Sequence, residues 1–302
     1  MLKNEKILIT GPASQVAFPI ARELVKANAV CGLARFGNPA DRARVEALGV
    51  TCFAADLARD AFDHLPDDFT YVLNFAVVRT DNFDYDLAAN GEGTARLMAH
   101  CRKAKAWLQC SSTAVYAYAG HQPLKETDPL GENGHRFLAP TYTLAKIAAE
   151  TMARFGARQW NIPTTIARLN VPYGDNGGWP AYHLNDMIAG SAIPVHPEKP
   201  NLYNPIHEDD SIAHIPKLLA AAAVPATTVN WGGSQQVALE DWCRYMGELT
   251  GIEPKFVETE RTIGSVPIDL TRMHQLLGHT TVDWRDGIRR MIRARHPERL
   301  RQ

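Results

Sequence analysis

The sequence predicts an α/β protein with a doubly wound parallel sheet and a smaller, loop-rich C-terminal region that binds the substrate. Strand and helix patterns alternate through the first half of the chain, as in parallel-sheet proteins. A tight turn with a glycine joins the first strand to the first helix. From Pro172 to Pro205, glycine and proline become frequent, which is typical of loops over a site.

The first predicted element is a short buried strand over Lys6–Thr10. A turn containing Gly11 and Ser14 follows and leads into a helix pattern over Ile20–Lys26. A strand, a tight turn and a helix N-terminus present free N–H groups and the positive end of a helix dipole to a pyrophosphate. Pro12 removes one of these N–H groups. The chain therefore opens with an expected dinucleotide-binding turn.

The next strands are predicted over Val30–Arg35, Thr51–Ala55 and Val72–Ala76. In dinucleotide-binding folds, an acidic residue near the end of the second strand holds the ribose 2′-OH, whereas an arginine there accommodates a 2′-phosphate. Here Ala34 and Arg35 occupy that place. We therefore expect NADP as the cofactor, with NAD as the alternative.

Two long helices are predicted over Leu87–Lys103 and Tyr142–Gln159, and a sixth strand over Thr164–Leu169. The dinucleotide-binding domain is expected to cover residues 1–170. The substrate-binding region would cover 171–302 and be discontinuous, because residues 227–233 resemble a strand that returns to the first domain.

A catalytic group is predicted from Tyr142 and Lys146, which stand four residues apart and so share one helix face. A nearby ammonium group favours the phenolate form of a tyrosine and makes it usable as an acid or base. Ser112 ends a preceding strand and has Thr113 beside it. Its hydroxyl would hold the substrate oxygen during proton transfer.

Along nearly its whole length, the chain resembles the extended short-chain dehydrogenase/reductases of the NAD-dependent epimerase/dehydratase type. Gly11 matches the first glycine of the family's TGxxGxxG turn, 112–116 matches its S/T-x-x-V-Y pattern, and 142–146 matches its YxxxK pattern. The resemblance implies a Rossmann-type fold. It also implies that Tyr142 exchanges a proton with the substrate, Ser112 orients the substrate oxygen and Lys146 binds the nicotinamide ribose.

The resemblance also implies a set of cofactor-binding residues. Asp56 matches the acid that faces the adenine, and Asn90 matches the N-x-x-G-T helix segment, although an asparagine there can equally serve helix packing or capping. The predicted set is Gly11, Ser14, Gln15, Val16, Arg35, Asp56, Leu57, Phe75, Ala76, Asn90, Tyr142 and Lys146.

Two positions argue against a nucleotide-linked sugar as the substrate. The family's R-x-x-N-x-Y-G run has Val171 at its usual asparagine place, and Asn170 stands one residue early, where an extended segment would point it the other way. The segment 200–205 has no basic residue, although a pyrophosphate needs a cation or several N–H donors. We instead expect a small alcohol or ketone, contacted by Arg79, Thr113, Trp179 and His183.

The predicted function is an NAD(P)-dependent oxidoreductase that interconverts an alcohol and a carbonyl on a small molecule. The alternative is an epimerase of a sugar or sugar nucleotide, which reduces and reoxidises its cofactor within one turnover. A dehydratase is less favoured because 112–114 lacks the family's Asp–Glu pair. A third hypothesis is a non-catalytic cofactor sensor, and the presence of Ser112, Tyr142 and Lys146 argues against it.

Composition excludes several other classes. The 302 residues are 45% hydrophobic, which suffices for a large core, and the formal net charge of −1 gives no case for a nucleic-acid or membrane-surface partner. No apolar run reaches the ~20 residues of a membrane span. The first strand begins too early for a signal peptide, and the five cysteines lack metal-ligand spacing. We expect a cytoplasmic protein without a metal, and the resemblance implies a homodimer built on the two long helices.

Overall fold

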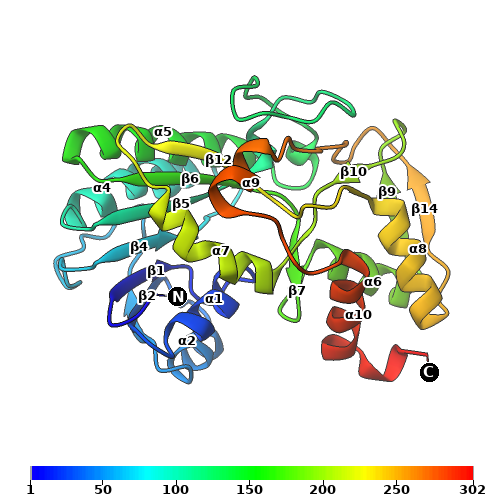
Figure 1. Ribbon diagram of the computed structural model, residues 1–302, viewed down its shortest axis with the longest axis horizontal. Coiled ribbons are helices and arrows are strands. Elements are labelled where there is room, and N and C mark those ends of the chain that lie inside the picture. Colours follow the sequence, from blue (N-terminus) through cyan, green and yellow to red (C-terminus); the bar gives the residue numbers. More distant parts are fainter. Residues whose placement is uncertain (1, 302) are drawn as a thin grey trace. The chain divides into compact units, whose positions relative to one another are not determined.

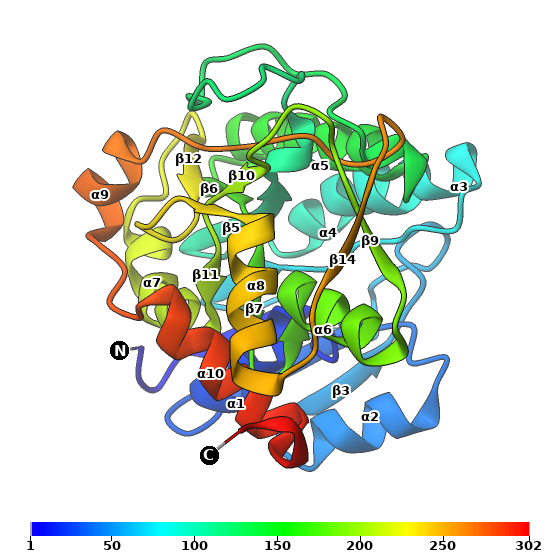
Figure 2. The same ribbon diagram turned by 90° about the vertical axis from the view of Figure 1, so that its right-hand side faces the viewer.

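The computed structural model describes residues 2–301 (Figures 1 and 2). These residues form two compact units. The first unit contains the residues up to Val115, Ala139–Arg168 and Ile212–Val229, and the second contains Tyr116–Leu138, Leu169–Ser211 and the residues from Asn230 onward.

These units can be set beside the expected regions 1–170 and 171–302. Residues 212–229 group with the first unit, and the strand β12, Thr227–Trp231, lies where the return strand was expected near 227–233. Residues 116–138 group with the second unit, to which their hydrogen bonds run. The Tyr116 hydroxyl donates to the Asn230 amide oxygen at 2.6 Å, and the Leu124 N–H donates to the Pro267 carbonyl at 2.9 Å. Sequence patterns along the chain do not report such long-range pairs.

A seven-stranded sheet with the order β12-β6-β5-β4-β1-β2-β3 organises the first unit. The pairs β1–β2, β2–β3, β1–β4 and β4–β5 are parallel. The chain moves outward from β1 to β3 and then returns to the other side of β1, which is the doubly wound order. This confirms the predicted fold class. The strands are β1 Lys6–Thr10, β2 Ala29–Ala34, β3 Thr51–Ala54, β4 Tyr71–Asn74, β5 Ala106–Ser112, β6 Thr164–Leu169 and β12 Thr227–Trp231.

Helices cover both faces of this sheet. In Figure 1, α4 and α5 lie side by side on one face, and α1 and α2 lie on the other. A π-helical turn, Ala88–Glu92, joins α3 to α4, so the predicted helix over 87–103 is part of one helical stretch that starts earlier. The helices are α1 Ala17–Leu24, α2 Pro39–Glu46, α3 Phe83–Leu87, α4 Gly93–His100, α5 Tyr142–Trp160 and α7 Glu208–Ala220.

The helix α5 carries the predicted catalytic tyrosine and is held close to its neighbours. Its buried face is built from alanines at 145, 149, 153 and 157, which allow close packing. Gly156 has the same effect, because a Cβ there would lie 2.6 Å from the Met98 sulfur of α4. The helix ends at Asn161, whose φ of 52° forms a left-handed cap that asparagine tolerates.

The second unit is made of short elements. Figure 2 shows α6, α8 and α10 side by side. Within the loop-rich stretch expected over 172–205, the structure contains one helix and several strands of two to four residues. The helices are α6 Trp179–Ala189, α8 Leu239–Thr250, α9 Thr271–Leu277 and α10 Trp284–Arg295. The strands are β7 Pro172–Gly174, β8 Gly177–Gly178, β9 Ala192–Val195, β10 Leu202–Tyr203, β11 Ile206–His207, β13 Val237–Ala238 and β14 Lys255–Glu258.

Neither unit offers a membrane-spanning helix: none of the helices between residues 2 and 301 combines the length and the apolar character that a membrane crossing requires.

Candidate active site

The turn after β1 has Gly11, Ser14 and Ala17 at the places of the family's three glycines. Gly11 has a φ of 63°, and a Cβ there would lie 3.1 Å from the Cα of Ala76. A side chain at this position would therefore fill the space between the turn and the strand end. Ser14 accepts a hydrogen bond from the Ala17 N–H at 3.2 Å, which supports the start of α1. The methyl group of Ala17 is fully buried where the family has its last glycine.

A cleft of about 250 Å³ lies beside this turn, at the carboxyl ends of the strands. Ligands of doubly wound sheets bind at this edge, where the strand order reverses. The cleft is lined by Gly11, Ser14, Arg35, Leu57, Phe75 and Ala76 of the predicted cofactor set. The other members of that set, Gln15, Val16, Asp56, Asn90, Tyr142 and Lys146, are not among its lining residues.

Several of the lining residues were missed from the sequence, among them Asp41 and Phe36. Asp41 lies in the first turn of α2, where acidic residues are common, so no sequence signal marks it. Phe36 follows Arg35 with a φ of 48°, a conformation that is strained for an aromatic residue. Gly37, which follows Phe36, also lines the cleft.

The predicted 2′-phosphate residue belongs to a hydrogen-bonded chain. The exposed Arg35 guanidinium donates to the Tyr85 hydroxyl at 3.3 Å, and this hydroxyl donates to Asp56 at 2.7 Å. Burial acts to raise the pKa of Asp56, but the hydrogen bonds from Tyr85 and the Ala58 N–H outweigh it and lower that pKa. Asp56 is thus an ionised carboxylate that fixes Tyr85, and Tyr85 fixes Arg35.

Asn90 holds the loop that follows β4. Its amide oxygen accepts from the Val78 N–H at 2.9 Å, and its amide nitrogen donates to the Val78 carbonyl at 2.8 Å. The same nitrogen also donates to the Asp86 carbonyl at 2.7 Å. The structure thus shows Asn90 hydrogen-bonded to a loop that lines the cleft, and its role in cofactor binding stays a prediction.

The three predicted catalytic residues come from β5 and α5 of one unit. Tyr142 is the first residue of α5, and the Lys146 nitrogen lies 5.9 Å from the centroid of its ring. Lys146 is 4% exposed and donates to the Cys110 carbonyl of β5 at 2.9 Å. Ser112 ends β5, and its hydroxyl accepts from the Ala114 N–H at 3.1 Å. The side chain of Thr113 is buried beside it.

A buried ion pair anchors these two elements and was not recognised from the sequence. Glu150 of α5 receives two bonds of 2.9 Å from Arg168 of β6 and one of 2.6 Å from the Ser111 hydroxyl of β5. Burial acts to raise the pKa of Glu150, but the bonds from Arg168 outweigh it and keep the carboxylate charged. A signal was present, because 142, 146 and 150 repeat every four residues on one helix face.

Two of the four predicted substrate contacts belong to a packed aromatic cluster. Trp179 and His183 lie in the second unit with Tyr203 and Trp242, with ring centroids 5.0 to 6.1 Å apart. His183 is 4% exposed, and its Nδ1 accepts from the Trp242 indole at 3.0 Å. Burial lowers the pKa of His183 to about 3. Arg79 and Thr113 lie in the first unit. The role of all four in substrate binding stays a prediction.

The segment that would bind a sugar-nucleotide phosphate is used internally in the second unit. The Asn170 amide donates to the Val266 carbonyl at 2.8 Å and accepts from the Asn204 N–H at 2.9 Å. The Asn204 oxygen accepts from the Ile268 N–H at 3.0 Å. Val171 has a φ of 34°, which is rare for a β-branched residue. Lys199, the nearest cation, pairs with Glu258.

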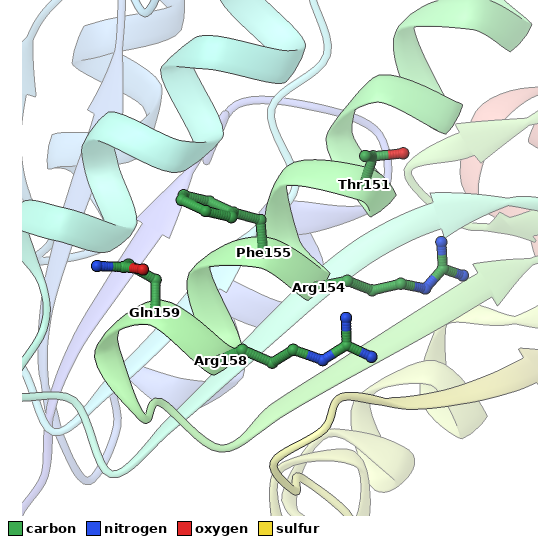
Figure 3. Close-up of a pocket in the computed structure, with 5 residues that line it drawn as sticks. All are labelled: Thr151, Arg154, Phe155, Arg158 and Gln159. Atoms are coloured by element: carbon green, nitrogen blue, oxygen red, sulfur yellow. The ribbon is translucent and has the colours of Figure 1, made fainter.

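A separate pocket of about 490 Å³ lies on the outer face of α5 (Figure 3). Phe155 and Gln159 project to one side of the helix, and Arg154 and Arg158 project to the other. Thr151 completes the lining. Phe155 is 50% exposed. The pocket begins nine residues along the helix from Tyr142 and is therefore a surface feature apart from the catalytic group.

Comparisons with known proteins identify the family. The sequence model of the NAD dependent epimerase/dehydratase family matches residues 7–223. No curated protein sequence matches the chain. Among solved structures, UDP-glucuronic acid 4-epimerase from Bacillus cereus, in complex with UDP-glucuronic acid and NAD, is 20% identical with a TM-score of 0.80. That match covers 95% of this chain and 97% of the epimerase.

Two further structures are similar over a comparable extent. MoeE5, in complex with UDP-glucose and NAD, is 21% identical with a TM-score of 0.79, covering 97% of this chain and 99% of MoeE5. DesIV, the dTDP-glucose 4,6-dehydratase from Streptomyces venezuelae with NAD and TYD bound, is 20% identical with a TM-score of 0.79, covering 97% and 98%. At these identities the likeness shows the fold. The family match spans most of the chain, so the protein belongs to the NAD dependent epimerase/dehydratase family and is an enzyme of the extended short-chain dehydrogenase/reductase type.

Proposed function

We propose that the protein oxidises a secondary alcohol on a small molecule with a nicotinamide dinucleotide held in the cleft of the first unit. One observation carries the proposal: Tyr142, Lys146 and Ser112 are fixed on β5 and α5 of the unit that also contains the cleft. The cleft lined by Gly11, Ala13 and Ser14 lies beside the start of α1, a position that suits a pyrophosphate. When bound, the cofactor accepts and returns the hydride.

Each residue of the group has a chemical role in this proposal. The Tyr142 hydroxyl exchanges a proton with the substrate oxygen. The Ser112 hydroxyl donates a hydrogen bond that orients that oxygen. Lys146 supplies a positive charge 5.9 Å from the centroid of the Tyr142 ring, and its bond to the Cys110 carbonyl fixes the ammonium group within the site.

We infer that the hydride returns to the same substrate, which makes the reaction an epimerisation of a sugar-like alcohol. The family and the similar structures support this alternative better than the net oxidoreductase that the sequence favoured. A net oxidoreductase stays the second candidate, and it is supported by the residues at 170–171 and 200–205. The internal bonds of Asn170 and Asn204, and the lack of a basic residue in 200–205, disfavour a nucleotide-linked sugar.

The assay that separates these candidates uses the purified protein with NAD or NADP and a panel of free sugars, UDP-glucose, alcohols and ketones. An epimerase yields an epimer, detected by NMR, without net reduction of the cofactor. A net oxidoreductase changes the absorbance of the reduced nicotinamide in proportion to product. If UDP-glucose bound tightly and turned over, the interpretation of 170–171 and 200–205 would be wrong.

We propose that Arg35 gives a preference for NADP, because its guanidinium matches a 2′-phosphate. Asp41 also lines the cleft and opposes a second negative charge, so the preference should be modest. The similar structures named above contain NAD. Calorimetric titration of NADPH and NADH should show tighter binding of NADPH, and Arg35→Ala should remove the difference. Equal binding by the unmodified protein would refute this assignment.

We propose a homodimer formed through the exposed face of α5, because Phe155 lies half exposed on that face (Figure 3). Phe155→Asp should lower the mass measured by light scattering to that of a monomer. Val257→Asp is the control, since Val257 is 47% exposed on β14 of the other unit. A monomeric unmodified protein would contradict the proposal.

We also infer a cytoplasmic location. The five cysteines at 31, 52, 101, 110 and 243 are all free thiols, which suits a reducing compartment. Fractionation of the native host should recover the protein with the cytoplasmic markers, and recovery from an oxidising compartment would contradict this.

A further inference from the structure

A carboxylate that no predicted motif contains lies under the loop after β4. The Asp86 side chain in α3 has no exposed surface. Burying a carboxylate is costly unless hydrogen bonds compensate it. At Asp86 the compensating donors are backbone N–H groups and hydroxyl groups. They lie in two other segments of the first unit, so the carboxylate links these two segments.

The first set of donors lies in the loop after β4. Thr80 donates to Asp86 through its N–H at 2.9 Å and through its hydroxyl at 2.8 Å, and the Asp81 N–H donates at 3.2 Å. Asp81 has a φ of 65°, so the loop is held in a conformation that non-glycine residues rarely adopt. Asn90 fixes the same loop one turn later through Val78. This loop begins at Phe75 and lines the cofactor cleft.

The second donor lies beside the catalytic tyrosine. Thr141 is 1% exposed, and its hydroxyl donates to Asp86 at 2.7 Å. It is the N-cap residue of α5 and makes no side-chain bond to the helix itself. The first turn of a helix is its least constrained part, and Tyr142 is the first residue of this turn. The bond to Asp86 therefore restrains the point at which Tyr142 enters the helix.

We infer that Asp86 is a positioning residue that joins the cleft-lining loop to the first turn of α5 and thereby fixes the Tyr142 phenol relative to the bound cofactor. The inference rests on the proposed function for its effect on turnover. Burial acts to raise the pKa of Asp86, but the bonds from Thr141 and Thr80 outweigh it and lower that pKa, so the carboxylate is charged. A negative charge bonded to the N-cap residue also stabilises the start of α5.

A simpler role for Asp86 is to support only its own helix. Asn82 already caps α3, since its side chain accepts from the Tyr85 N–H at 3.0 Å. If Asp86 served α3 alone, loss of the Thr141 hydroxyl would have no effect on the tyrosine. The two roles therefore predict different effects of a change at Thr141, which leaves the bonds of Asp86 to Thr80 and Asp81 intact.

The test compares Thr141→Val with Thr151→Val, a matched change on an exposed turn of the same helix, where the hydroxyl bonds only to the Ile147 carbonyl. Hydrogen exchange of the peptide covering 140–147 and fluorescence titration with NADH need no substrate. Turnover is measured with the best substrate of the panel above. We expect Thr141→Val to speed exchange in 140–147, leave NADH affinity unchanged and lower kcat about tenfold or more, because small misplacements of a catalytic group have such effects.

Asp86→Asn should speed exchange both in 76–82 and in 140–147, and should weaken NADH binding as well as lowering kcat. Exchange and kcat in Thr141→Val equal to those in Thr151→Val would overturn the inference, whatever the behaviour of Asp86→Asn. Absence of any turnover by the unmodified protein would instead refute the proposed function, and the exchange comparison would still decide whether Asp86 positions the first turn of α5.

Discussion

Val171→Asn is the substitution that tests the interpretation of the second unit most fully. Val171 has a φ of 34°, in the left-handed region that asparagine tolerates and β-branched residues avoid. The cost of such a conformation is about 1–2 kcal/mol for an ordinary residue. Val171 is only half-buried, so replacing its methyl groups removes little buried apolar surface.

We therefore expect Val171→Asn to stabilise the protein by about 1 kcal/mol, since relief of strain exceeds the lost burial. For a chain of this size, that corresponds to a rise in melting temperature of about 2 °C. The assay is urea denaturation followed by fluorescence, with calorimetry as a check. Val257→Asn is the control, because Val257 is 47% exposed and lies in the extended strand β14, where the substitution relieves no left-handed strain.

A loss of stability in Val171→Asn as large as that in Val257→Asn would refute the strain argument. The same variant also tests substrate choice, because it restores the residue of the family's R-x-x-N-x-Y-G run. We expect UDP-glucose to bind Val171→Asn more tightly than the unmodified protein. The absence of any gain would show that the segment 200–205, without a cation, is the larger obstacle.

Three further predictions concern the site and its support. Glu150→Gln leaves Arg168 buried without its charged partner and should destabilise the protein by about 3 kcal/mol in urea denaturation, whereas Arg154→Gln, at the exposed side of the same carboxylate, should cost far less. His183 has a pKa of about 3 in the folded protein, below the ordinary value of about 6.5, so the fold is fully stabilised by the neutral imidazole above pH 6.5. As the pH falls to 5, the free energy of unfolding should drop by about 2 kcal/mol. His183→Gln should remove this pH dependence of stability, and an unchanged dependence would contradict the assignment. Gly11→Ala should destabilise the protein by about 1–2 kcal/mol in urea denaturation and weaken NADH binding in fluorescence titration, because it places a Cβ at a φ of 63° and 3.1 Å from the Cα of Ala76; stability and NADH binding equal to those of the unmodified protein would contradict this.

The fold was largely predictable from the sequence because short apolar runs and helix periodicity are local signals. The strands β1 and β6 and the start of α5 lie where the patterns predict them. The grouping of 116–138 with the second unit has no local sequence signal, because bonds such as that between Leu124 and Pro267 join residues far apart in the chain.

The candidate site was predictable where a motif has fixed spacing, as for Ser112, Tyr142 and Lys146. Its supports were not fully predictable, because Asp86 and Glu150 bond to partners on other elements, although the four-residue spacing of Glu150 from Lys146 was a signal. Asp41 lines the cleft without a sequence signal. Asp86 belongs to no sequence motif, and its bond to Thr141 joins residues 55 apart in the chain.

The most direct test of the proposed chemistry is the turnover of Tyr142→Phe beside that of Tyr182→Phe. Tyr182 is 60% exposed on α6 and serves as the matched loss of a hydroxyl. Removing a general acid or base typically lowers a rate by about 10²–10⁴-fold. We predict a fall of this size for Tyr142→Phe with unchanged NADH binding, and unmodified turnover for Tyr182→Phe. Turnover in Tyr142→Phe equal to that of the unmodified protein would contradict the assigned chemistry and favour a cofactor-binding protein without catalysis.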